Sequence, residues 1–103
     1  MTDDTKSKAY LFYAEWGPQR SSPRPQRLAA AFPSVSEQER QNWIADFEAV
    51  NKELWQAAEQ GGPRTGSFDA FKRHMRRLFP FMNEDALRFA WTVVGYYTAH
   101  EGY

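Results

Sequence analysis

Residues 36–59 read SEQERQNWIADFEAVNKELWQAAE, and this stretch decides the fold. Ser36 is a good helix N-cap, and Glu39, three residues later, completes a capping box. Apolar residues then recur at steps of four and three, which is the period of one helix face: Trp43, Phe47, Val50, Leu54 and Ala57. The Gly-Gly-Pro sequence at 61–63 ends the pattern. The stretch therefore predicts a long amphipathic helix whose apolar stripe other elements must cover.

Further helices are predicted on both sides of this stretch, at 25–32, 67–79 and 83–99. Polar caps at the starts and prolines just past the ends delimit them. Residues 8–16 are ambiguous, because their apolar run fits either helical spacing or a buried strand. A following Gly-Pro favours a helix there. The polar residues 1–7 are predicted to be a disordered tail.

Two segments resemble each other: Phe-Pro-Ser-Val-Ser-Glu at 32–37 and Phe-Pro-Phe-Met-Asn-Glu at 79–84. Both combine a helix end, a Phe-Pro pair, an apolar residue, an N-cap and an acidic first turn. Each segment predicts a tight corner between two helices. Because proline stops and polar caps are common, this similarity does not by itself indicate a duplicated helical hairpin.

Length and composition narrow the class of protein. The 103 residues fit one domain. The chain has no cysteine, which rules out disulfides, thiol catalysis and thiolate metal sites. The apolar run at 9–14 is far shorter than the ~18 residues of a membrane span, and too short for a signal-peptide core. We therefore predict a soluble, cytoplasmic, all-α protein without membrane association. Its single domain, residues 8–103, should be a compact bundle of four to five helices with short capped turns.

No pattern in the chain indicates catalysis. GxSxG, HExxH and the phosphate-binding glycine loops do not occur. His74 and His100 are the two histidines, whereas a zinc site needs three or four ligands. His74 also lies in a basic run, which repels a cation. We therefore predict a protein that is not an enzyme, with no catalytic residue, no metal site and no cofactor.

Basic residues concentrate in one predicted helix and just before it: Arg64, Lys72, Arg73, Arg76 and Arg77. Within the helix they form two rows with a spacing of four, which could grip phosphates. The segment 67–99 also has the order of a helix-turn-helix. Its second helix, however, begins with Glu84 and Asp85, which would face the DNA. Nucleic-acid binding through helix 67–79 is therefore an alternative and not the favoured function.

Aromatic residues are abundant at 17% of the chain. Tyrosine and tryptophan are enriched in interface cores, because their rings are apolar and their tips are polar. We expect the two terminal segments to pack together and to leave an aromatic patch for a protein partner or a second subunit, formed by Trp16, Tyr96, Tyr97 and Tyr103. An aromatic-lined pocket for a small ligand is a further alternative.

Charge alternates along the chain although the formal net charge is zero. Residues 36–60 carry six acidic and two basic side chains, whereas residues 61–82 carry one acidic and five basic side chains. These blocks could pair within one chain or between chains. Together, the missing catalytic motifs, the aromatic surplus and the charge blocks favour a small non-enzymatic module that acts through protein–protein contacts.

Overall fold

The computed structural model describes residues 3–14 and 24–100. Within these ranges the chain forms five α-helices and a short 3-10 helix, with no strand, which confirms the predicted all-α fold. The elements are α1 Asp3–Ala14, α2 Arg24–Ala31, α3 Glu37–Glu59, η2 Gly62–Arg64, α4 Phe68–Leu78 and α5 Glu84–His100.

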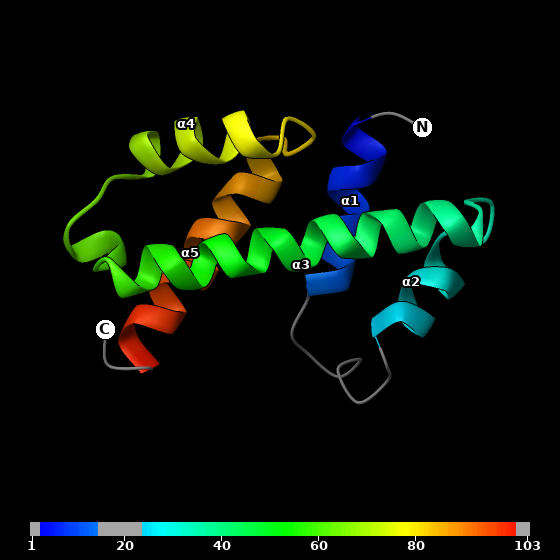
Figure 1. The fold of residues 1–103 in the computed structure, drawn as a ribbon, viewed down its shortest axis with the longest axis horizontal. Helices are drawn as coiled ribbons and strands as arrows, with labels where there is room; N and C mark the ends of the chain where they lie inside the picture. Colours follow the sequence, from blue (N-terminus) through cyan, green and yellow to red (C-terminus); the bar gives the residue numbers. More distant parts are fainter. Residues whose placement is uncertain (1–2, 15–23, 101–103) are drawn as a thin grey trace.

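Helix α3 extends along the longest dimension of the molecule, and the other helices cross it or flank it (Figure 1). Its predicted apolar stripe is buried at Trp43, Phe47, Val50 and Leu54. At the helix end the fully buried position is Ala58, while the predicted Ala57 is partly buried. The stripe therefore continues with a step of four where we expected three.

Helix α5 provides most of the cover for α3 and also contacts α1, α4 and η2. Its buried residues lie within an arc of about 140° on one side of the helix: Ala86, Leu87, Ala90, Val93, Val94 and Thr98. The opposite side of α5 is exposed.

The predicted helix caps are formed. The side chains of Ser36 and Ser67 accept the backbone amides of Glu39 and Ala70, at 3.1 and 3.2 Å. Asn83 Oδ1 accepts the amide of Ala86 at 3.0 Å. Each contact satisfies one amide of a helix start that has no partner within the helix.

The two similar segments form equivalent corners, which we call the first corner (residues 32–36) and the second corner (residues 79–83). In both, the phenylalanine carbonyl accepts a hydrogen bond from the amide three residues on, Val35 at 3.2 Å or Met82 at 3.1 Å. Val35 and Met82 are both buried. The backbone carbonyls of the two corners accept hydrogen bonds from different side chains. Arg40 donates to carbonyls of the first corner, and Ser7 donates to the Phe81 carbonyl of the second.

The prediction of a disordered tail at residues 1–7 is wrong for residues 3–7, because these residues belong to α1. Ser7 is 0% exposed, and its hydroxyl donates to the carbonyl of Phe81 at 2.7 Å. The same oxygen accepts the amide of Asn83 at 2.9 Å. The side chain of Lys6 binds Asp46 on α3 and lies over the Phe81 ring. These contacts order a polar segment that its composition alone marks as a tail. The ambiguous run is therefore helical up to Ala14, and Trp16 lies outside the described residues.

Replacing Ser7 with Ala should lower the free energy of unfolding by about 1–3 kcal/mol, because a buried carbonyl and an amide lose their partner. Urea denaturation measures the change. Lys8→Ala, at an exposed position of the same helix, is the control and should change stability by less than about 0.5 kcal/mol. Equal, small effects of both substitutions would contradict the docking of α1 on the second corner.

Candidate functional site

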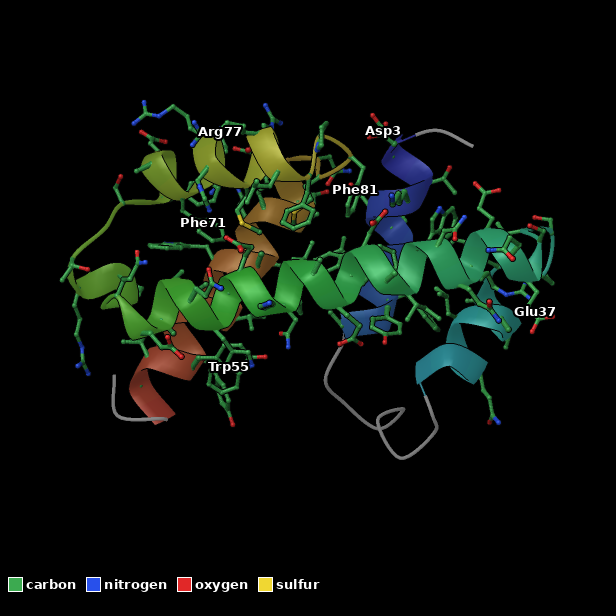
Figure 2. All side chains as sticks on the ribbon, viewed as in Figure 1. Asp3, Glu37, Trp55, Phe71, Arg77 and Phe81 are labelled. Carbon is green, nitrogen blue, oxygen red and sulfur yellow. The ribbon has the colours of Figure 1, made fainter. Side chains whose placement is uncertain are left out.

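Helix α4 has two opposite faces. Phe71 and Met75 are buried, whereas Arg73, Arg76 and Arg77 are exposed. Figure 2 shows Arg77 pointing away from the molecule, while Phe71 lies on the inner side of the helix. The helix is thus held by one narrow apolar face, and its basic face is open to solvent.

Two side chains of α4 contact carboxylates of the same chain. Lys72 Nζ lies 3.1 Å from Glu84 Oε2, and His74 Nε2 lies 2.9 Å from Glu53 Oε1. The hydrogen bond from Lys72 holds the pKa of Glu84 below its ordinary value despite an opposing desolvation effect, and the charges of Lys72, Arg88 and Arg76 add to the lowering. At Lys72, therefore, a basic side chain of the block 61–82 pairs with a carboxylate of the same chain.

Three arginines of α4, Arg73, Arg76 and Arg77, have no hydrogen-bond or ion-pair partner among the described residues. Arg64 belongs instead to η2, which packs against α5 and α3, and it has contacts of its own. The structure therefore narrows the predicted phosphate-binding set to the three arginines that share one helix face. We call Arg73, Arg76 and Arg77 the α4 face.

The structure describes two of the four residues of the predicted aromatic patch. Tyr96 and Tyr97 lie together on α5, with ring centroids 6.3 Å apart, and Tyr96 is 45% exposed. Trp16 and Tyr103 lie outside the described residues. The ring of Trp55 on α3 stacks on that of Tyr97, with ring centroids 3.8 Å apart and an angle of 7° between the planes.

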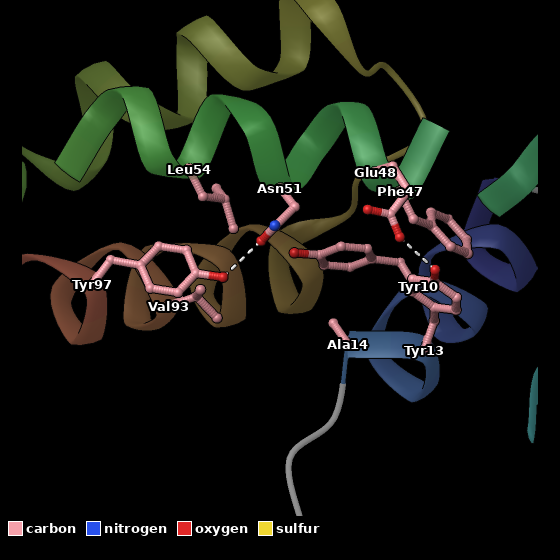
Figure 3. A pocket seen from close by; sticks show the side chains of 9 residues that line it. All are labelled: Tyr10, Tyr13, Ala14, Phe47, Glu48, Asn51, Leu54, Val93 and Tyr97. Carbon is pink, nitrogen blue, oxygen red and sulfur yellow. Dashed lines mark hydrogen bonds between the residues drawn. The ribbon is translucent and has the colours of Figure 1, made fainter. Parts of the chain in front are cut away.

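A pocket lies where α1, α3 and α5 meet (Figure 3). Helix α1 contributes Tyr10 and Tyr13, α3 contributes Glu48 and Asn51, and α5 contributes Tyr97. The Tyr97 hydroxyl donates to Asn51 Oδ1 at 2.8 Å, and the Tyr13 hydroxyl donates to Glu48 Oε1 at 2.5 Å. The pocket therefore has apolar walls with a few oriented polar groups.

Tyr10 is the unusual member of this pocket. Its side chain is 2% exposed, yet its hydroxyl has no hydrogen-bond partner among the described residues. Burial raises the pKa of this phenol, and the nearby Tyr97 hydroxyl raises it further. Tyr10 was one of several aromatic residues in an ambiguous run, and only the packing of three helices distinguishes it.

The described residues contain no group of three or more His, Cys, Asp or Glu side chains that could hold a metal ion. None of the helices in these ranges combines the length and the apolar character needed to cross a bilayer. The side chain of His100 is not among those described.

No protein-family model, curated protein or solved structure matches the chain significantly. What the protein does must therefore be inferred from the α4 face and the pocket.

Replacing Tyr10 with Phe should reduce the loss of stability at high pH. The unfolded chain releases the phenolic proton near pH 10, whereas the folded chain retains it, so alkali favours unfolding. The contribution of Tyr10 is complete below pH ~10, and above it the wild type should lose up to about 1.4 kcal/mol more per pH unit than Tyr10→Phe. Urea denaturation at a series of pH values measures both slopes. Parallel slopes would show that Tyr10 ionises normally in the folded chain.

Proposed function

We propose that the protein is a small non-enzymatic interaction module that binds an acidic segment of a partner protein through the α4 face. The observation that carries this proposal is the group of three exposed arginines, Arg73, Arg76 and Arg77, without a hydrogen-bond or salt-bridge partner among the described residues. The neighbouring Lys72, by contrast, has a carboxylate partner, Glu84, in the same chain.

The geometry of the α4 face suits carboxylates. Arg73 and Arg77 are four residues apart and Arg76 is three from Arg73, so their side chains start from one side of the helix, within about 6 Å along its axis. The guanidinium group is a planar fork that binds a carboxylate through two parallel hydrogen bonds. A short acidic segment could therefore bind two of the arginines at once.

An apolar side chain is exposed at the end of α4, on the side of the helix that carries Phe71 and Met75. Leu78 ends α4 and is one of two large hydrophobic residues exposed within the described ranges. The helix is held in place from behind by Phe71 and Met75 and by the Ser67 cap. Binding would therefore require little ordering of the helix itself, which favours affinity.

Carboxylates around the α4 face favour a protein partner over nucleic acid. Asp69 lies in the first turn of α4, and Glu84 and Asp85 begin α5. Asp3 and Asp4 of α1 line the same groove as Arg76. A long polyanion would meet these negative charges on both sides of the arginines, whereas a short acidic segment would not.

The test compares two fluorescent probes by anisotropy, a short peptide of alternating Glu and Leu and a random-sequence DNA duplex. We expect the peptide to bind more tightly than the duplex, and the binding to weaken with salt. The double variant Arg73→Gln/Arg77→Gln should weaken peptide binding about tenfold or more, because two charge-assisted contacts are lost.

The matched control is Lys8→Gln/Lys52→Gln, which removes the same charge from exposed positions of α1 and α3 and should leave peptide binding nearly unchanged. If both double variants lose the same amount of peptide affinity, the effect comes from net charge alone, and the proposal is overturned. Tighter binding of the duplex would replace the protein partner with nucleic acid. Light scattering on the same samples shows whether a second copy of the chain is the partner.

A further inference from the structure

The pocket between α1, α3 and α5 contains a polar atom that the fold leaves unsatisfied. The Tyr10 hydroxyl points into it, toward the side on which Tyr97 and Asn51 lie (Figure 3). Tyr10 is 2% exposed and donates to no described residue. A buried hydroxyl without a partner is rare, because it has lost its water without gaining a protein hydrogen bond. This position therefore favours a bound polar group.

The pocket has the charge of a cation site. Glu48, an exposed side chain of α3, is the one charged residue among the described residues that line the pocket. Its Oε1 accepts the Tyr13 hydroxyl, and its Oε2 has no partner among the described residues. The oxygen of Tyr10 can also accept a hydrogen bond. A positively charged ligand that donates hydrogen bonds would pair with the solvent-exposed carboxylate of Glu48 and donate to the Tyr10 oxygen.

Aromatic rings form much of the wall. Phe47 lies against the rings of Tyr10 and Tyr13, with centroids 5.6 and 5.5 Å apart. Tyr97 lies on the opposite side of the pocket. Its ring stacks on that of Trp55, which is not among the residues that line the pocket. Aromatic rings attract a cation electrostatically.

The size of the pocket selects the cation. The centres of water-sized atoms can occupy about 30 Å³, room for about two such atoms. An –NH₃⁺ group and the carbon attached to it fit this space, whereas a trimethylammonium group is too large. We propose that this pocket binds the primary ammonium end of an unbranched alkyl chain, with Glu48 and Tyr10 as its hydrogen-bond acceptors.

The same chemistry occurs in free alkylamines and in lysine side chains, so the probes must separate these two sources. Methylammonium tests the pocket alone, n-butylammonium tests a free chain, and Nα-acetyl-lysine methylamide tests a lysine side chain. Binding is followed by NMR on the Asn51 side-chain amide and the Val93 methyl groups, which line the pocket. A ligand of two heavy atoms should bind no more tightly than about 5 mM.

We expect saturable shifts with methylammonium and none with methanol or tetramethylammonium. A lower Kd for n-butylammonium than for the lysine derivative would identify a free amine as the ligand, and the reverse would identify a lysine side chain. Glu48→Gln should weaken binding about tenfold or more, and Tyr10→Phe several-fold, because each loses a charge-assisted contact.

Glu59→Gln is the control, since it removes an exposed carboxylate from the same helix outside the pocket lining, and its Kd should equal that of the wild type. Circular dichroism checks that each variant is folded. An unchanged Kd in Glu48→Gln, equal shifts with methanol, or no saturable shift with any of the amines would overturn the proposal. The last result would assign the pocket to water.

Discussion

The structure depends on the burial of one long apolar stripe on α3. The helix has 23 residues and is about 34 Å long, whereas α5, the next longest described helix, has 17 residues. No other described helix can therefore cover the whole stripe. Phe32, the residue after α2, contacts Trp43. Helix α1 contacts Phe47 through Tyr10 and Tyr13, and α5 covers the part toward the end of α3. The remaining helix, α4, packs on α5 at the margin of the bundle.

Because several shorter helices each cover only a part of α3, the positions of the two candidate sites can be explained. The pocket forms on α3 at the junction between the part covered by α1 and the part covered by α5. The aromatic side chains that meet at this junction do not fill the space between the helices. The α4 face exists because α4 buries only Phe71 and Met75, so nothing constrains its outer side to be apolar. Both sites are thus consequences of covering one long helix with shorter ones.

Features that depend on neighbours in the chain could be predicted from the sequence. The α3 stripe, the caps at Ser36 and Ser67 and the two Phe-Pro corners each involve residues within one or two helical turns. The three arginines of the α4 face belong to the same class, since their spacing on one helix brings them together.

Features that depend on distant pairs could not be predicted. The start of α1 was missed because Ser7 finds its partner 74 residues later, and no local signal marks that pairing. The stack of Trp55 on Tyr97 and the isolation of the Tyr10 hydroxyl follow from how α1, α3 and α5 cross. Arg64 was grouped with the basic helix by its closeness in sequence, but η2 places it on a different element.

The link between Ser7 and the second corner also has a consequence for how the chain is made. Ribosomes add about 5–20 residues per second, so several seconds separate the synthesis of Ser7 from that of Phe81. During this interval α1 has neither its hydrogen-bond acceptor at Phe81 nor the α5 surface on which it packs. An isolated helix of this length is marginal in water. Helix α1 therefore leaves the ribosome well before the surface on which it packs, and it docks only after α5 has been made.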